Sequence, residues 1–198
     1  MDTLLKSGYW KIMKLFYIER NLKIHLRDIA RKTKLNGNSV SRFLKQLENE
    51  EILSFIKEGN LKKYGVKRNK NVYFIFSLFD LERFNKLPNK RKNAIKYFID
   101  CLDEKPVIVI LFGSTAKETF TEKSDVDLLL VVNRKIKIES SENYAASQTG
   151  IKINCIQIIY NRFIEELKMQ TDKVIQSAIL SGYPIFNPIH FYEVYYGN

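Results

Sequence analysis

Four residues in the second half of the chain have types and a spacing that suit phosphate and metal chemistry. Gly113 and Ser114 end an apolar run, and Asp125 and Asp127 follow after ten intervening residues. Glycine lets a backbone approach a ligand closely, and free N–H groups beside a following serine can cradle a phosphate. Alternation along a strand places the two aspartates on one face, where they repel unless a divalent cation lies between them. The pattern predicts a site for Mg²⁺ and phosphate.

Two apolar runs must position these four residues. Residues 107–112 have the composition of a strand buried on both faces, and this strand ends at Gly113. Asp127 leads directly into a second apolar run, residues 128–132. Aspartate is depleted in strands, so two acids at the entry to a strand indicate a functional role.

The segment FGSTAKETFTEKSDVDLLLVV, residues 112–132, combines the strand, the Gly-Ser pair, the spacing and the two aspartates. It resembles the signature of the DNA polymerase beta-like nucleotidyltransferase superfamily, and most closely its minimal nucleotidyltransferase branch. The resemblance implies a small mixed sheet flanked by helices over residues 105–198. It also implies an enzyme that transfers a nucleoside monophosphate from a nucleoside triphosphate to a protein or small-molecule acceptor.

The same resemblance assigns roles to single residues. Gly113 and Ser114 would hold the phosphates of the nucleoside triphosphate, ATP being one candidate, and Lys117 would add positive charge there. Asp125 and Asp127 would be the catalytic residues. They would also be the metal ligands, binding two Mg²⁺ ions as in other in-line displacements at phosphorus.

One position departs from the family pattern. Catalytic members supply a third carboxylate from a later strand, and residues 151–159 match that strand, but Asn154 occupies the place of the acid. Asparagine offers a neutral oxygen, which is a weaker Mg²⁺ ligand and cannot accept a proton. Unless Glu139 or Glu142 reaches the site, we expect transfer to be weakened or lost while nucleotide binding is retained.

The positive charge of the chain is concentrated in its first half. The 198 residues have a formal net charge of +11. Residues 1–92 hold 22 Lys and Arg against 9 Asp and Glu, a net of +13, whereas residues 93–198 have a net of −2. An uneven basic charge favours a dedicated module that binds a polyanion.

Composition excludes several other classes of protein. Hydrophobic residues make up 45% of the chain, too many for a disordered protein. No apolar run approaches the ~20 residues of a membrane span, so no membrane partner is expected. Only two cysteines occur, which excludes a disulfide scaffold and favours a cytoplasmic protein.

The first half has the periodicity of three helices. Apolar spacing predicts one amphipathic helix over residues 8–20 and two shorter helices within residues 24–53. A turn over residues 34–37, in which Gly37 allows the reversal, separates the two shorter helices, and Asn38 or Ser39 is expected to cap the second of them. A short helix, a tight turn and a second helix form the helix-turn-helix pattern.

Two stretches after these helices favour strands. Residues 52–58 and residues 71–77 are rich in β-branched and aromatic side chains, and the basic segment between them predicts an arm at the tip of a hairpin. With this hairpin, residues 5–78 resemble the winged helix-turn-helix domains of bacterial and archaeal transcription regulators. The same fold also serves as an RNA-binding or protein-binding module, and that alternative stays open.

The residues that we expect to contact double-stranded DNA are polar or basic and lie on the last helix or on the arm. Small donors and arginine near a helix N-terminus suit base edges and phosphates, and a basic arm suits the DNA backbone. They are Asn38, Ser39, Ser41, Arg42, Lys45, Lys62, Lys63, Lys67 and Arg68.

Together these features predict an α+β protein, from a prokaryote, with three parts. Residues 1–80 form the winged helix-turn-helix domain, residues 81–104 a helical connector, and residues 105–198 the nucleotidyltransferase domain. Two functions are compatible with it. The first is a nucleotidyltransferase that also binds DNA. The second is a transcription regulator or antitoxin whose catalytically degenerate domain binds nucleotide or a toxin-like partner protein. A homodimer remains open in both.

Overall fold

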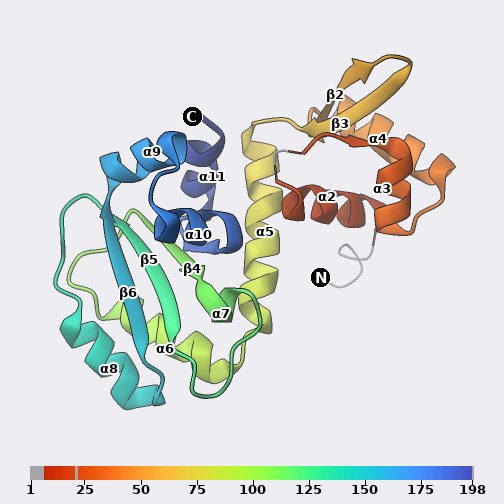
Figure 1. Cartoon of the computed structure of the whole chain (residues 1–198). Helices are drawn as coiled ribbons and strands as arrows, with labels where there is room; N and C mark the ends of the chain where they lie inside the picture. Colours follow the sequence, from red (N-terminus) through yellow and green to blue (C-terminus); the bar gives the residue numbers. More distant parts are fainter. Residues whose placement is uncertain (1–6, 21, 198) are drawn as a thin grey trace. The chain divides into compact units, whose positions relative to one another are not determined.

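The computed structural model describes residues 7–20 and 22–197, so the first six residues of the predicted N-terminal domain, Asn21 and Asn198 lie outside the description. The chain divides into two compact units after Phe79. Each unit combines helices with a sheet, which confirms the predicted α+β class (Figure 1). No helix in the described ranges is long and apolar enough to cross a membrane.

The first unit has the elements of a winged helix. Phe16, Ile29 and Leu44, one from each of its first three helices, are buried in its core. Its strands pair antiparallel in the order β1-β3-β2. The elements are α2 (Gly8–Ile18), β1 (Ile24–His25), α3 (Leu26–Thr33), α4 (Gly37–Asn49), β2 (Leu53–Glu58), β3 (Leu61–Val66) and the first part of α5 (Lys70–Lys86).

The predicted second strand of the hairpin is wrong. Residues 71–77 belong to α5, and the hairpin is instead closed by Gly59 and Asn60 between paired Glu58 and Leu61. Gly59 has a φ of +58°, which glycine adopts without steric cost. The β-branched and aromatic residues of 71–77 favoured a strand, but packing against the core at helical spacing decided the outcome.

The helical spacing is visible in the exposed fractions of α5. Val72 and Phe76 are completely buried, whereas Phe74 between them is 56% exposed. In a strand, these three side chains would share one face. The basic arm therefore does not exist as an extended tip. Of its predicted DNA contacts, Lys62 and Lys63 lie on β3. Lys67 and Arg68 directly follow that strand.

The turn between α3 and α4 lies where the sequence predicts it, but the residue that makes the reversal is not the predicted glycine. Gly37 is the first residue of α4, and the reversal comes from Lys34, whose φ is +56°. Asn36 caps α4, because its side-chain oxygen accepts a hydrogen bond from the backbone N–H of Asn38 at 2.9 Å. The predicted caps, Asn38 and Ser39, lie instead within the helix.

We expect Asn36→Ala to destabilise the first unit. Removing an asparagine N-cap costs about 1 kcal/mol, because it leaves a helix N–H group without its partner. For a domain of this size the melting temperature should fall by roughly 4–8 °C, measured by thermal unfolding. Asn38→Ala is the matched control, since it keeps the backbone N–H that Asn36 binds. An equal loss in both variants would contradict the capping role.

The second unit is a mixed four-stranded sheet with helices around it. Strand order is β6-β5-β4-β7, with β5 and β6 parallel and the other neighbours antiparallel. Besides the end of α5, its elements are α6 (Asn89–Asp100), β4 (Ile108–Phe112), α7 (Gly113–Ala116), β5 (Val126–Val132), α8 (Glu139–Thr149), β6 (Ile153–Ile159), α9 (Tyr160–Met169), α10 (Lys173–Ser181), β7 (Tyr183–Phe186) and α11 (Pro188–Gly197).

The two faces of β5 have different roles. One face carries apolar residues that pack in a single buried cluster with α6 and α8: Val126, Leu128, Leu130, Val132, Ala94, Ile95, Phe98 and Ala145. Asp127 belongs to the opposite face, because side chains alternate along a strand. Helix α6, which lies in the span of the predicted connector, is thus part of the core that holds the sheet.

Candidate functional site

Gly113 lies directly against the carboxylate of Asp127. Strands β4 and β5 pair so that Phe112 stands opposite Asp127, and Gly113 follows with a φ of +68°. A Cβ atom at position 113 would lie 2.0 Å from Oδ2 of Asp127. No other residue fits without displacing that carboxylate. The glycine of the motif is therefore required both by its backbone conformation and by the acid beside it.

The two aspartates lie together at the entry to β5. Asp125 immediately precedes the strand and Asp127 is its second residue, so their side chains leave the chain on the same side. Both are half-buried. The structure thus brings Asp125, Asp127 and Gly113 to one end of the β4–β5 pair, as the sequence predicted.

Asn154 is next to Asp127 on the neighbouring strand. In the parallel pairing of β5 with β6, Asp127 stands opposite Asn154. Nδ2 of Asn154 donates a hydrogen bond to Oδ1 of Asp127 at 3.0 Å. The position predicted for a third carboxylate is therefore at the site, but it presents a donor to the acid instead of a negative charge.

Neither glutamate considered as a substitute acid lies on this face. Glu139 and Glu142 belong to α8, which packs on the same face of the sheet as Cys155 of β6. Asn154 lies on the other face of the sheet, because side chains alternate along a strand. Burial and the nearby Glu139 raise the pKa of Glu142, and Lys152 and the Cys155 backbone oppose this shift. The open alternative, that Glu139 or Glu142 completes the acid set, has no support from the face on which α8 packs.

The donor set at the site fits a metal ion that is shared with a phosphate. The described residues contain no group of three or more His, Cys, Asp or Glu side chains that could hold a metal by themselves. Mg²⁺ is commonly held by one or two carboxylates together with substrate phosphates. Asp125 and Asp127 meet that requirement. When bound there, the ion would neutralise charge on the phosphates.

The other predicted phosphate-binding residues lie close to Gly113 in the chain. Ser114 is half-buried in α7, and Lys117 ends that short helix with an exposed side chain. Thr119 donates its backbone N–H to the carbonyl of Ser114 at 3.0 Å, which closes the turn after the helix. Lys117 can therefore reach toward the solvent side of the site without disturbing a packed contact.

Arg91 is a site residue that the sequence reading missed. It stands between Lys90 and Lys92 in the sequence, a basic run typical of an exposed surface, but it is only 3% exposed. Its guanidinium binds the segment that joins the Gly-Ser pair to the two aspartates. A signal was present in the sequence, since Arg91 falls at the helical spacing of the apolar stripe that includes Ile95 and Phe98.

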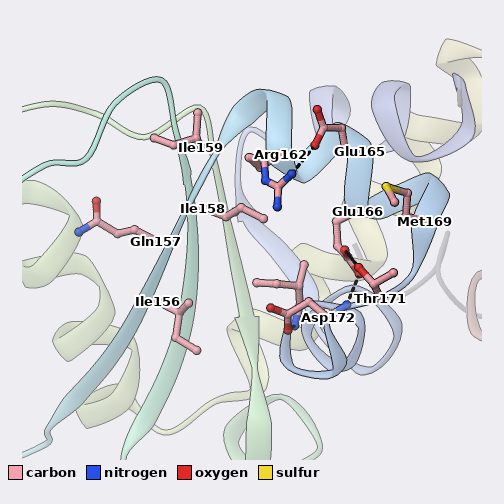
Figure 2. Close-up of a pocket in the computed structure, with 11 residues that line it drawn as sticks. Ile156, Gln157, Ile158, Ile159, Arg162, Glu165, Glu166, Met169, Thr171 and Asp172 are labelled. Atoms are coloured by element: carbon pink, nitrogen blue, oxygen red, sulfur yellow. Dashed lines mark hydrogen bonds and ion pairs between the residues drawn. The ribbon is translucent and has the colours of Figure 1, made fainter.

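A hollow of about 470 Å³ lies between β6 and the helices α9 and α10. Figure 2 shows side chains of β6 on one side of it and those of α9 and the start of α10 on the other. Ile156 and Ile158 lie on the same face of β6 as Asn154. A volume of this size can hold a small molecule.

The acidic residues around this hollow have local partners. Glu165 pairs with Arg162 at 2.9 Å. Glu166 accepts hydrogen bonds from the Thr171 hydroxyl and the Asp172 backbone N–H. Burial alone would raise the pKa of Glu166, but hydrogen bonds from Gln176, Asp172 and Thr171 outweigh it and lower the pKa. The Glu166 carboxylate therefore stabilises the α9–α10 turn, and the Glu165 pair lies within α9.

In the first unit, the predicted DNA-contacting residues of α4 are mostly accessible. Asn38, Ser41, Arg42 and Lys45 are exposed, and Ser39 is half-buried. The Arg42 guanidinium lies 5.5 Å from the centre of the Phe43 ring. Within the described part of the chain, Arg42 and Lys45 form no ion pair with a carboxylate, so their charges are available to a partner.

The lysines near the hairpin differ, because each is paired with a glutamate. Nζ–Oε distances are 3.9 Å for Lys62 and Glu48, 2.6 Å for Lys63 and Glu58, and 3.0 Å for Lys67 and Glu51. The hydrogen bond from Lys63 lowers the pKa of Glu58, and His25 adds to the shift. Arg68 is exposed.

Comparison with known proteins identifies the second unit. Residues 92–188 match the family model described as "Polymerase beta, Nucleotidyltransferase", which confirms the domain predicted from the motif. The description of the family model does not specify a branch, so the resemblance to the minimal nucleotidyltransferase branch stays a prediction. No curated protein matches the chain.

Among solved structures, the chain is similar to transcription regulators. One is MepR of Staphylococcus aureus, a regulator of the multidrug efflux pump MepA, with 16% identity, a TM-score of 0.34 and coverage of 48% of this chain and 78% of that chain. A mutant of the same protein bound to an oligodeoxyribonucleotide has 18% identity and a TM-score of 0.34, and the match covers 48% of this chain and 75% of that chain. The archaeal chromatin protein TrmBL2 has 16% identity and a TM-score of 0.29, and the match covers 86% of this chain and 74% of that chain.

Proposed function

We propose that this chain is a DNA-binding regulator whose nucleotidyltransferase domain holds a Mg²⁺-bound nucleoside triphosphate as a ligand. The observation that carries this proposal is the hydrogen bond from Nδ2 of Asn154 to Oδ1 of Asp127 at 3.0 Å. It places a neutral donor, in the position of the third acid, opposite Asp127 on the parallel strand β6.

The remaining residues of the site suit binding. Gly113 leaves room for the carboxylate of Asp127, and the acid pair can share a metal ion with phosphates. An attacking hydroxyl needs a group that takes its proton, and the amide of Asn154 cannot do so. Binding of the nucleotide therefore has more support than its turnover.

The DNA-binding part rests on the charge and shape of the first unit. Helix α4 follows a tight turn from α3 and exposes Arg42 and Lys45 with small polar residues. A second helix of this kind inserts into the major groove in helix-turn-helix proteins. The net charge of +13 over residues 1–92 supports a polyanion as its partner. The prokaryotic cytoplasm is the setting that we propose for this pairing.

Equilibrium dialysis tests the nucleotide part. The full chain is dialysed against each of the four α-labelled ribonucleoside triphosphates, with Mg²⁺ and with EDTA in its place. We expect at least one to bind only with Mg²⁺ and to be recovered unchanged. Asp127→Asn should lose this binding, while Glu104→Gln, a change in an exposed pair with Arg134, should retain it. Absence of binding by every nucleotide would contradict the proposal.

Transfer of a nucleoside monophosphate is the second candidate function. It is favoured by the intact motif, Gly113, Ser114, Asp125 and Asp127, and by the hollow between β6 and α9, which has room for a small molecule. The acceptor would be a small molecule or a partner protein of the toxin type. Incubation of the chain with the same labelled nucleotides and a cell lysate decides this. Label on an acceptor that disappears with Asp125→Asn would establish transfer in place of ligand binding.

Exposed cations of α4 should contribute more to DNA affinity than the paired lysines of the hairpin. A lysine that is bound to a glutamate must break that pair to contact a phosphate. We expect Arg42→Ala with Lys45→Ala to weaken binding to a 30-bp duplex about tenfold or more and to reduce the slope of log K against log salt by about 1 per contact. Fluorescence anisotropy at several salt concentrations measures both.

Lys62→Ala with Lys63→Ala is the matched comparison, because this double variant also removes two positive charges. We expect a smaller loss of affinity and a smaller change in slope. Equal losses in the two double variants would show that only total charge matters. An affinity that does not depend on salt would contradict contact with the DNA backbone.

A further inference from the structure

The segment that joins Gly113–Ser114 to Asp125–Asp127 has little regular structure of its own. After α7 it continues without helix or strand until β5 begins at Val126. Its internal bonds are few and local: the Thr121 N–H donates to Oγ of Ser124 at 2.9 Å, and the Ser124 N–H donates to the Thr121 carbonyl at 3.1 Å. The segment between α7 and β5 therefore depends on contacts with other elements for its shape.

We propose that Arg91 is the positioning residue that holds this segment, and with it Asp125, in place for the metal-bound nucleotide. This inference rests on the proposed function. Nη2 of Arg91 donates to the carbonyls of Thr121 at 2.7 Å and Ser124 at 2.9 Å. Nη1 donates to Oγ1 of Thr115 at 2.9 Å and lies 3.5 Å from the carbonyl of Asp125.

Thr115 extends this network to the Gly-Ser side of the site. Its side chain is completely buried, and its hydroxyl lies 3.4 Å from the carbonyl of Asp125. One guanidinium thus connects α7 to the last residues before β5. The plane of Arg91 also lies over the Phe120 ring, 4.2 Å from its centre, so the middle of the segment is held as well.

The guanidinium of Arg91 is buried among neutral acceptors. They are the carbonyls of Thr121 and Ser124 and the hydroxyl of Thr115. A buried cation is unfavourable unless its donors are satisfied, and the segment supplies the acceptors that satisfy them. These hydrogen bonds therefore fix the guanidinium and the segment to each other.

Lysine cannot replace Arg91 in this role. Arginine presents five N–H donors in a rigid plane and can bind several acceptors while it stacks on a ring. A lysine ammonium keeps the charge but cannot span Thr115, Thr121 and Ser124 together. The family match begins at residue 92, one residue after Arg91, so the match assigns it no role.

Hydrogen exchange of the full chain tests whether Arg91 holds the segment. We expect the amides of Thr119, Thr121 and Ser124 to exchange at least tenfold faster in Arg91→Met than in wild type. Leu102→Ala is the matched control, since it removes a buried contact of the same helical region without touching the segment. Amides of β4 and β5 serve as the internal reference. Equal rates for the segment in both variants would overturn the inference.

Titration calorimetry with the Mg²⁺ nucleotide that wild type binds tests the link to the site. We expect Arg91→Met and Arg91→Lys to weaken binding at least tenfold, with Leu102→Ala within twofold of wild type. Wild-type affinity in Arg91→Met, despite faster exchange, would overturn the positioning role. If wild type binds no nucleotide, the proposed function fails, and the exchange rates alone decide whether Arg91 holds the segment.

Discussion

Asn154→Asp should make the stability of the second unit depend on Mg²⁺ and should increase nucleotidyl transfer at least a hundredfold. The new carboxylate would replace an amide that lies 3.0 Å from Oδ1 of Asp127. Two charges about 4 Å apart repel by about 1 kcal/mol in bulk water and by about 4 kcal/mol near a protein surface. Without a metal ion, the melting temperature should therefore fall by several degrees.

Addition of Mg²⁺ should reverse this loss, because the three carboxylates then share a cation. The gain in transfer has a chemical reason, since the new acid can accept the proton of an attacking hydroxyl. Thermal unfolding with Mg²⁺ and with EDTA measures the first effect, and labelling of an acceptor in lysate the second. Asn143→Asp, in α8 on the opposite face, is the charge control and should show neither effect.

A variant with unchanged stability in EDTA would contradict the placement of Asn154 beside Asp127. A variant that shows the Mg²⁺ effect but no transfer would separate metal binding from catalysis. That outcome would support a regulatory ligand and argue against an enzyme that has lost a single acid.

Gly113→Ala should abolish nucleotide binding, with a loss of affinity of a hundredfold or more. Two penalties act together. Alanine at the φ of +68° costs about 1–2 kcal/mol in the backbone. In addition, the new Cβ would meet Oδ2 of Asp127 at 2.0 Å, so the carboxylate must leave its position.

Gly150→Ala separates these penalties. Gly150 has a nearly equal φ of +65°, but the nearest atom to an added Cβ is Nζ of Lys90 at 3.8 Å. We expect both variants to lose similar backbone stability in thermal unfolding, while only Gly113→Ala loses nucleotide in the dialysis experiment. Equal loss of nucleotide in both would show that backbone strain alone disrupts the site.

The centre of the candidate site was predictable because its residues come from two short segments joined by strand pairing. Gly113 directly follows β4, and Asp127 is the second residue of the neighbouring strand β5. Apolar runs identify both strands in the sequence. Asn154 was also placed well, since alternation along β6 fixes its face once the strand pairs with β5. The rejection of Glu142 required the structure, because only packing shows which face α8 covers.

Other features depend on packing that local patterns do not express. Residues 71–77 favour strands by composition, yet they form a helix because Val72 and Phe76 are buried together. Arg91 looked like a surface cation within a basic run, and its burial follows from the face of α6 that meets the sheet. The pairing of Lys63 with Glu58 depends on how β2 and β3 pair. The sequence placed the second strand of this hairpin at residues 71–77, so it did not predict this pair.

The contact between Gly113 and Asp127 also constrains how this site can change during evolution. As long as Asp127 is retained, every mutation that gives residue 113 a side chain must displace its carboxylate. Once Asp127 is lost or shortened, only the backbone cost remains. We therefore expect loss of the acid to precede loss of the glycine in lineages that abandon the ligand.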